Sequence, residues 1–470
     1  LESRDLTSEE LTKASLAHIE KTKHLNCFIE LLPNQAIAAA KASDSRRKEK
    51  KTLGLLDGIP LAVKDIFNLE SSHTTCASKI LKNFRSPYDA TVVKRLKEAG
   101  AVIVGKNNMD EFAMGSSNEN SSFGHVKNPW NTEYVPGGSS GGSAASVAGC
   151  QVFGSIGTDT GGSIRQPAAF CGVVGIKPTY GRVSRYGIIA FASSLDQAGP
   201  LARSVDDAAI LLKTISGHDS YDSTSVNIKP FEFHFDEKSQ LKGLRIGLPK
   251  EYFQDGLDNE VKKSLFSAID TFKKLGVTFI DISLPLTQYG IATYYLICTA
   301  EASSNLARYD GIRYGLRIDN NQGLKSLYSQ SRTQGFCDEV KRRIMIGTYV
   351  LSSGYYDAYY RKAQQIRTLL LKDFQKVFES VDLILTPTSP TTAFKIGEKS
   401  SDPLSLYLAD IFTVTCNLAG LPGLSMPCGF DSKALPIGMQ LLSSHFQEEK
   451  IFQAAKSFEM IHSPIVYPKL

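Results

Sequence analysis

The chain has 470 residues, of which 42% are hydrophobic and 21% are charged, and its formal net charge is +5. This composition is that of an ordinary soluble globular protein, and the length allows a large buried core. The mild positive charge permits a partner that carries RNA but does not require one. No apolar run approaches the roughly 18 residues that cross a bilayer, so we expect neither a membrane span nor a signal peptide.

The eight cysteines are scattered along the chain and form no C-x-x-C pair. Their spacing disfavours a zinc ribbon and a thioredoxin-type motif. A chain of this length does not need disulfides to hold its core, so we expect reduced cysteines in a reducing compartment.

A capped helix is the first element that the sequence predicts, over residues 7–22. Thr7 and Glu10 form a T-x-x-E capping box, and apolar residues follow at helical spacing. The charged stretch 41–52 predicts a solvated connection.

Strand and helix patterns then alternate. The predicted strands are 59–63, 101–104, 244–248, 277–282, 383–385 and 423–426, and the predicted helices are 91–99, 143–148 and 259–275. This alternation predicts an α/β fold whose sheet is covered by helices on both faces. Residues 286–380 differ, because they are mostly helical and rich in Tyr and Arg. We expect this region to pack beside the sheet and to wall part of a pocket.

Two glycine- and serine-rich loops carry the candidate chemistry: P-G-G-S-S-G-G-S at 136–143 and D-T-G-G-S-I-R at 159–165. The first loop is a poor flexible linker, because a small-residue apolar helix follows it directly. It lacks the G-K-[ST] ending of a phosphate-binding loop. It contains G-x-S-x-G, but the nucleophile elbow with that pattern needs a strand directly before the serine, and V-P-G-G is not one.

A lysine completes the set, since Lys64 ends the apolar stretch G-I-P-L-A-V-K-D at 58–65. A serine nucleophile needs a base, and no histidine of this chain stands in a motif that would supply one. Burial disfavours the charged form of lysine and turns it into a neutral base. The combination points to amide chemistry carried out by Ser and Lys.

Residues 55–205 resemble the amidase signature family through the segments 58–65, 105–115, 135–148, 157–167 and 172–178. The resemblance implies the amidase-signature fold, with a mixed central β-sheet covered by helices on both faces. It also implies one amidase domain over residues 1–470, with 55–205 as its catalytic core.

The family resemblance implies a Ser–Ser–Lys triad. It places Ser163 as the nucleophile, Ser139 as a bridging serine that follows a cis peptide bond, and Lys64 as the base. The backbone N–H groups around Thr160, Gly161 and Gly162 are then expected to form the oxyanion hole. Asp159 and Arg165, which flank the nucleophile, are interpreted as a supporting ion pair.

Further segments resemble the glutamine-hydrolysing subunits of tRNA-dependent amidotransferases, among them 108–115, 176–187, 308–311, 341–344, 353–356 and 407–410. Such proteins supply ammonia that converts mischarged Glu-tRNA(Gln) to Gln-tRNA(Gln). Free glutamine is a zwitterion, so its site needs a cation and an anion. By resemblance, Arg343 would hold the α-carboxylate and Asp410 the α-ammonium, and Tyr294 would wall the pocket. A surface salt bridge is the alternative for each charged residue.

The same resemblance implies a heterotrimer. A B subunit would bind ATP and Mg²⁺ and receive Glu-tRNA(Gln), and a small C subunit would stabilise this chain. The chain itself carries no nucleotide or metal motif, so we expect no cofactor in it. A bacterial cytoplasm is the expected location, with an organelle matrix as the alternative. A stand-alone amidase for another small amide, and a non-catalytic assembly protein whose glycine loops bind an anion, are the competing functions.

Overall fold

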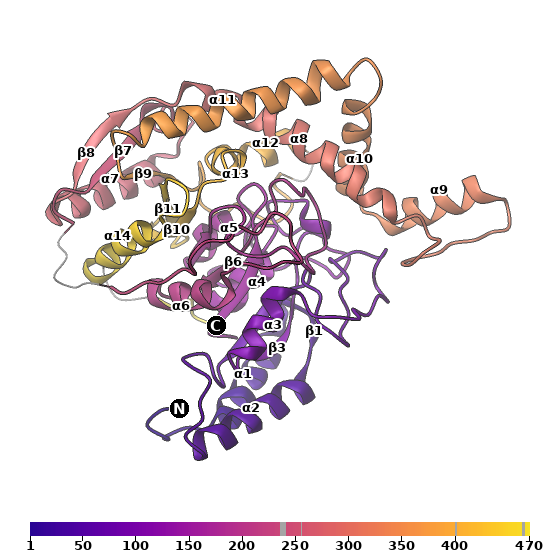
Figure 1. The fold of residues 1–470 in the computed structure, drawn as a ribbon, viewed down its shortest axis with the longest axis horizontal. Coiled ribbons are helices and arrows are strands. Elements are labelled where there is room, and N and C mark those ends of the chain that lie inside the picture. Colours follow the sequence, from indigo (N-terminus) through magenta and orange to yellow (C-terminus); the bar gives the residue numbers. More distant parts are fainter. Residues whose placement is uncertain (236–240, 255, 400–401, 463–465) are drawn as a thin grey trace.

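The structure is a computed structural model, and it describes residues 1–235, 241–254, 256–399, 402–462 and 466–470. The strands in this part of the chain form one 11-stranded sheet, in the order β1-β3-β2-β4-β6-β5-β10-β11-β9-β7-β8 (Figure 1). Their bounds are β1 Phe28–Leu31, β2 Pro60–Lys64, β3 Val102–Asn107, β4 Gly154–Thr158, β5 Val174–Lys177, β6 Ala198–Ala202, β7 Arg245–Pro249, β8 Thr278–Ile282, β9 Leu383–Pro387, β10 Gly423–Phe430 and β11 Pro436–Ser443.

The sheet is mixed. β2 lies parallel to both β3 and β4, and β7 lies parallel to both β8 and β9. The strands between these two parallel groups are joined by antiparallel pairs from β4 through β6, β5, β10 and β11 to β9. The predicted mixed α/β fold is therefore confirmed.

The α-helices connect and flank the strands. Their bounds are α1 Ser8–Lys21, α2 Pro33–Lys48, α3 Thr91–Glu98, α4 Gly141–Ala148, α5 Arg165–Cys171, α6 Val205–Ile215, α7 Asn259–Lys274, α8 Gly290–Asn305, α9 Leu324–Gly335, α10 Asp338–Val350, α11 Lys362–Val377, α12 Pro403–Leu408, α13 Val414–Leu418 and α14 Glu448–Ile461. The shorter helical turns are η1 Lys23–Leu25, η2 Glu111–Ala113, η3 Lys250–Tyr252, η4 Pro285–Tyr289, η5 Leu306–Arg308 and the π-helix η6 Tyr356–Arg361.

Helices cover both faces of the sheet, because successive residues of β2 point into different cores. Leu61 and Val63 belong to a large apolar core that also contains side chains of α3 and α6. Ala62, between them, belongs to a second core that includes α4 and α5. Side chains alternate between the two faces of a strand. Figure 1 shows the helices on either side of the strands, as this alternation requires.

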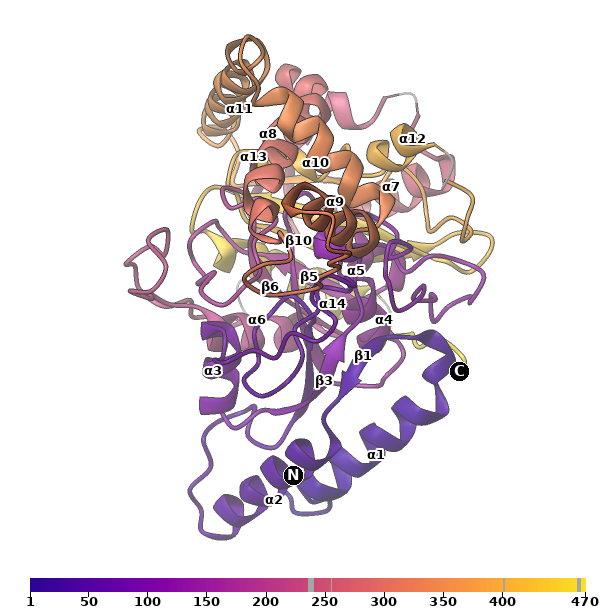
Figure 2. The ribbon, with the colours of Figure 1, turned by 90° about the vertical axis from the view of Figure 1, so that its right-hand side faces the viewer.

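The predicted local elements lie close to the observed ones. α1 begins after Thr7, and both hydrogen bonds of the capping box with Glu10 are present. The predicted strands 59–63 and 101–104 correspond to β2 and β3. Residues 286–380 contain helices and no strand, as expected. Figure 2 shows α10 and α11 from this region at one end of the molecule and α1 and α2 at the other.

The prediction for 41–52 was wrong in its first part, because α2 continues to Lys48. This helix buries only small residues, Ala36, Ala40 and Ser43, so its buried face has a weak apolar signature. Basic residues in its last turn favour the helix, since they interact with the negative end of the helix dipole. No helix in the described ranges combines the length and the apolar character that a membrane crossing requires.

Candidate active site

The lysine of the predicted triad lies where parallel strands end. Lys64 is the last residue of β2, and Thr158 is the last residue of β4, its parallel neighbour. The carboxyl ends of parallel strands meet at one edge of a sheet, where ligand sites of α/β folds commonly lie. The two glycine-serine loops lead from this edge into α4 and α5.

Lys64 is completely buried and surrounded by hydroxyl groups. Its Nζ donates to Ser139 Oγ at 2.7 Å, to Ser140 Oγ at 2.9 Å and to Thr158 Oγ1 at 2.9 Å. Burial lowers the pKa of Lys64 to about 7, although nearby carboxylates, Asp110 first among them, act in the opposite direction. A substantial fraction of this amine is therefore neutral near pH 7 and can accept a proton.

Ser139 reaches Lys64 from a loop with an unusual backbone. The peptide bond between Gly138 and Ser139 is cis, as the family resemblance implies. The N–H of Gly138 donates to Gln166 Oε1 at 3.0 Å. A Cβ at position 138 would lie 2.1 Å from Asp110 Oδ2, so only glycine fits there. The tight loop directs the Ser139 hydroxyl toward the lysine.

Ser163 lies on the second loop, with only 8% of its surface exposed. Its carbonyl oxygen accepts a hydrogen bond from the N–H of Ser140 at 3.2 Å, which ties the two loops together. Its hydroxyl makes no hydrogen bond to any residue that the structure describes. The structure thus joins Lys64 to Ser139 directly and brings Ser163 beside them through the backbone.

The backbone of the second loop presents N–H groups near Ser163. The N–H of Gly162 donates to Asp159 Oδ1 at 2.8 Å. The N–H groups of Thr160 and Gly161 make no hydrogen bond within the described ranges. A Cβ at position 161 would lie 2.5 Å from Cζ of Tyr294, so this tyrosine packs directly on the loop.

A buried ion pair supports the loop, as the sequence predicts. Arg165 Nε lies 3.0 Å from Asp159 Oδ2, and both side chains are completely buried. Burial would raise the pKa of Asp159, but the Arg165 guanidinium and hydrogen bonds hold it at about 2. Arg165 also donates to Asn417 Oδ1 at 2.6 Å and to Gln440 Oε1 at 3.0 Å, which anchors the loop to α13 and β11.

Arg343 lies on the inner face of α10, and its side chain is only 3% exposed. Its Nε donates to Glu339 Oε1 at 2.7 Å. The guanidinium lies over the rings of Tyr295 and Tyr407, 5.2 Å and 5.4 Å from their centroids. Its two terminal nitrogens donate to no described residue. The structure therefore contradicts the alternative of a surface salt bridge. It leaves the two terminal nitrogens of Arg343, which form the fork of its guanidinium, without a partner among the described residues.

Asp410 is 6% exposed, which also excludes a surface salt bridge. Its Oδ2 accepts a hydrogen bond from Ser116 Oγ at 2.5 Å. Burial raises the pKa of Asp410 to about 7, against the lowering effects of Ser116 and Arg343. Thr413 connects this residue to the nucleophile loop, because its Oγ1 lies 3.0 Å from the Asp410 carbonyl and donates to the Gly161 carbonyl at 2.6 Å.

Sequence reasoning did not single out several polar partners in this site. Ser140 and Thr158 complete the surroundings of Lys64, and Ser116 holds Asp410. Glu339 stands four residues before Arg343 on one helix, a spacing that predicts contact, so this partner could have been found from the sequence. Ser116 lies 294 residues from Asp410, and no local pattern links them.

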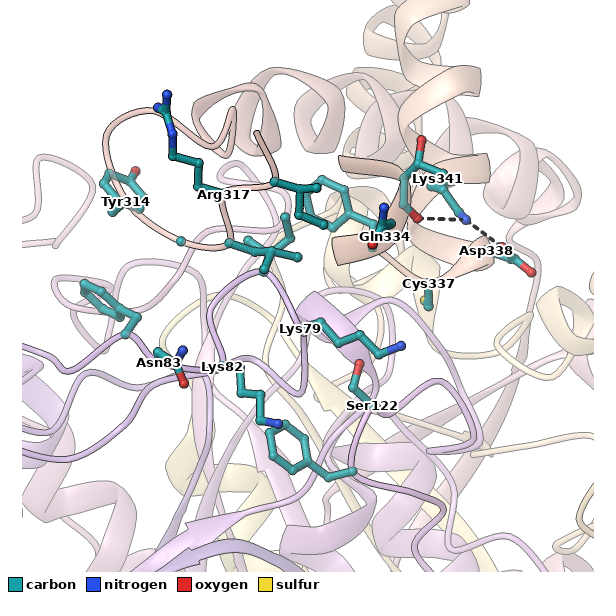
Figure 3. Close-up of a pocket in the computed structure, with 18 of the residues that line it drawn as sticks. Lys79, Lys82, Asn83, Ser122, Tyr314, Arg317, Gln334, Cys337, Asp338 and Lys341 are labelled. Atoms are coloured by element: carbon teal, nitrogen blue, oxygen red, sulfur yellow. Dashed lines mark hydrogen bonds and ion pairs between the residues drawn. The ribbon is translucent and has the colours of Figure 1, made fainter. Parts of the chain in front are cut away.

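A large cavity lies elsewhere, between residues 79–85 and the start of α10 (Figure 3). Its volume is about 1230 Å³, and Lys79, Lys82 and Lys341 are among its lining residues. None of the predicted site residues lines it. The described residues contain no group of three or more His, Cys, Asp or Glu side chains that could hold a metal ion.

Comparisons with known proteins identify the family of this chain. The model of the family described as Amidase matches residues 10–452. The A subunit of the glutamyl-tRNA(Gln) amidotransferase of Geobacter metallireducens is 58% identical over 98% of this chain and 95% of its own length. The protein of the same name from Halalkalibacterium halodurans is 55% identical over the same shares.

Solved structures give the same result. The A subunit of the glutamyl-tRNA(Gln) amidotransferase of Thermotoga maritima has a TM-score of 0.81 and 42% identity, over 99% of this chain and 98% of that one. The peptide amidase of Stenotrophomonas maltophilia has a TM-score of 0.82 and 30% identity, over 100% of this chain and 96% of its own. The family match, the full-length relatives and the shared fold together show that this chain belongs to the amidase family.

Proposed function

We propose that this chain is the glutamine-hydrolysing component of a glutamyl-tRNA(Gln) amidotransferase. Relatives that are named as the A subunit of that enzyme match the chain over nearly its whole length. The observation that carries the assignment of glutamine is the burial of both Arg343 and Asp410, with Asp410 connected to the Gly161 loop through Thr413. A zwitterionic substrate needs both charges, whereas a neutral amide needs neither.

We assign the chemistry to Lys64, Ser139 and Ser163. Neutral Lys64 accepts the proton of Ser139, 2.7 Å away, while Ser139 accepts the proton of Ser163. Ser163 Oγ bonds to the side-chain amide carbon of glutamine. The relayed proton then goes to the departing nitrogen, which leaves as ammonia. Water cleaves the glutamyl ester by the reverse proton path and releases glutamate.

The oxyanion that forms on the amide carbonyl is assigned to the backbone around Thr160, Gly161 and Gly162. The N–H groups of the first two are uncommitted within the described ranges, while that of Gly162 is shared with Asp159. Loss of one such donor typically lowers the rate about 100- to 1000-fold.

The recognition of glutamine is assigned to three further residues. The free fork of Arg343 suits the α-carboxylate, since guanidinium and carboxylate pair through two parallel hydrogen bonds. Ionised Asp410 suits the α-ammonium. Tyr294, which belongs to α8 and packs on Gly161, forms a wall of the pocket beside the nucleophile loop.

The released ammonia is proposed to convert Glu-tRNA(Gln) to Gln-tRNA(Gln) in a complex. A B subunit supplies ATP, Mg²⁺ and most of the tRNA contact, and a C subunit completes a heterotrimer. The names of the relatives, which describe one component of a larger enzyme, support the need for partners, and their bacterial sources support a bacterial cytoplasm. The amidase domain is proposed to span residues 1–470, with 55–205 as its catalytic core.

Ammonia release from glutamine tests this proposal. It is measured for the chain alone and then with B and C subunits, ATP and Glu-tRNA(Gln). We expect strong stimulation in the complex and its loss in Ser163→Ala. Added ammonium salt is the control, because it should restore Gln-tRNA(Gln) formation to the Ser163→Ala complex. Equal activity without partners would contradict the proposal.

A stand-alone amidase for another small amide is the second candidate. The peptide amidase of Stenotrophomonas maltophilia, with its similar fold and 30% identity, supports this alternative. A panel of amides decides between the two. Faster turnover of a neutral amide than of glutamine would favour the stand-alone enzyme.

A further inference from the structure

We propose that Tyr295 is a further substrate-binding residue, whose hydroxyl donates a hydrogen bond to the α-carboxylate of glutamine beside Arg343. This inference rests on the proposed function, because it takes glutamine as the substrate. It concerns a residue that the sequence patterns do not single out.

The Tyr295 hydroxyl is buried and has no hydrogen-bond partner among the described residues. Buried tyrosine hydroxyls usually find a partner, because desolvating a hydroxyl without one costs free energy. A polar atom that stays unpaired in the free protein becomes satisfied when a ligand supplies the missing partner. The hydroxyl of Tyr252 is a contrast, since it bonds to Thr415 Oγ1 at 2.8 Å.

The ring of Tyr295 is held in place from two sides. It stacks on Tyr407, with centroids 4.0 Å apart and an interplanar angle of 25°. It meets Tyr294 edge to face, with centroids 5.1 Å apart. Tyr407 itself donates its hydroxyl to Glu339, which also holds Arg343. The orientation of the Tyr295 hydroxyl is therefore set by the same side chains that orient the arginine.

Arg343 of the proposed binding pair lies against the face of this tyrosine. The Arg343 guanidinium carbon lies 5.2 Å from the ring centroid. Burial raises the pKa of Tyr295, and the charged groups that act on it most are Arg343 and then Asp410. The hydroxyl therefore remains protonated at working pH and is a donor on a ring that Arg343 contacts.

A donor of this kind fits the carboxylate better than the ammonium. The α-ammonium of glutamine brings only donors, and the Asp410 carboxylate is available to accept from it. The α-carboxylate brings acceptors only, with more lone pairs than one guanidinium fork uses. The Tyr295 hydroxyl supplies the additional donor on the arginine side of the site.

The test is Tyr295→Phe, which removes the hydroxyl and keeps the ring, measured in the complex with B and C subunits. We expect KM for glutamine to rise about tenfold, as for loss of a hydrogen bond to a charged group, while kcat changes less than about twofold. The denaturation midpoint of the free chain should stay equal or rise, because an unsatisfied buried hydroxyl has been removed. A residue with only a structural role would show the opposite pattern, with lower stability and an unchanged KM.

Tyr252→Phe is the matched control, and it should lower the denaturation midpoint without changing KM. Two truncated substrates identify the group that is bound. The KM effect of Tyr295→Phe should persist with 4-carbamoylbutanoate, which keeps the carboxylate, and vanish with 4-aminobutanamide, which lacks it. An unchanged KM for glutamine, or an effect confined to 4-aminobutanamide, would overturn the inference. Absence of glutamine hydrolysis in the unmodified complex would instead refute the proposed function.

Discussion

The two glycine-serine loops around Lys64 differ from the recognition shell, by which we mean Arg343 and its neighbours Glu339, Tyr295 and Tyr407. The two regions meet different physical requirements. In the first region, hydroxyls and backbone groups surround the lysine amine, and a buried ion pair fixes the nucleophile loop. In the second region, the terminal nitrogens of Arg343 and the hydroxyl of Tyr295 have no partner in the described chain. In the first region the lysine amine and the Asp159–Arg165 pair are already satisfied and hold the loops in place, whereas in the second region the groups proposed to bind the substrate have no partner among the described residues.

The solved relatives share a fold but differ in the substrates that their names state. The peptide amidase of Stenotrophomonas maltophilia has nearly the same fold, yet its name states a different substrate. A family can keep one set of loops for amide cleavage and vary the side chains on the surrounding helices. Changes in the loops should therefore affect the rate of every substrate, and changes in the shell should affect only substrates that carry the recognised charge.

The largest effect is expected from Lys64→Met. Loss of the base should lower kcat for ammonia release about 10⁴-fold, because members of a catalytic unit act together. Higher pH should not restore the rate, and neutral amides should lose the same factor. Initial rates with a circular-dichroism control for folding measure this. Retention of a tenth of the activity would show that Lys64 is not the base.

The next effect is on stability and separates the scaffold from the chemistry. Arg165→Met leaves Asp159 buried without its partner and should lower the free energy of unfolding by about 3–5 kcal/mol. Urea denaturation measures it. The matched control is Arg317→Met, since Arg317 and Asp319 form a pair with side chains 50% and 37% exposed. The free energy of unfolding of that variant should fall by less than about 1 kcal/mol. An equal decrease in the free energy of unfolding of the two variants would mean that burial of the Asp159–Arg165 pair does not matter for stability.

A smaller and more selective effect is expected from Arg343→Lys. Lysine keeps the charge but loses the planar fork, so KM for glutamine should rise about 10- to 100-fold. With 4-aminobutanamide, which has no carboxylate, KM should not change. Arg342→Lys is the control, because the side chain of Arg342 is 43% exposed. An equal rise in KM for both substrates would mean that Arg343 supports the structure of the site rather than recognising the carboxylate.

The smallest effect is that of pH. Lys64 must be neutral and Asp410 ionised, and burial brings the pKa of each to about 7. Both active forms are deprotonated, so kcat/KM for glutamine should rise with pH, about two- to fourfold between pH 7 and 8. With 4-carbamoylbutanoate, which lacks the ammonium, only Lys64 should contribute, and the rise should be about twofold. A rate that falls over this range would contradict a lysine base.

Part of the fold could be predicted because its information is local. Thr7 and Glu10 predict the start of α1, and the strand that ends at Lys64 was placed within one residue of β2. Helix α2 was missed in part because Ala36 and Ala40 give little apolar contrast. The roles of Lys64, Ser139 and Ser163 in catalysis remain predictions that the experiments above address.

The sequence by itself determined several of the helices and strands, the two glycine-serine loops and the residues to examine, because these depend on short-range patterns and on a family resemblance. Only the tertiary structure decided that Arg343 and Asp410 are buried rather than exposed, and that Ser116 meets Asp410 across 294 residues. It alone showed the unpaired hydroxyl of Tyr295. Burial and hydrogen-bond satisfaction depend on which distant segments pack together, and no local pattern contains that information.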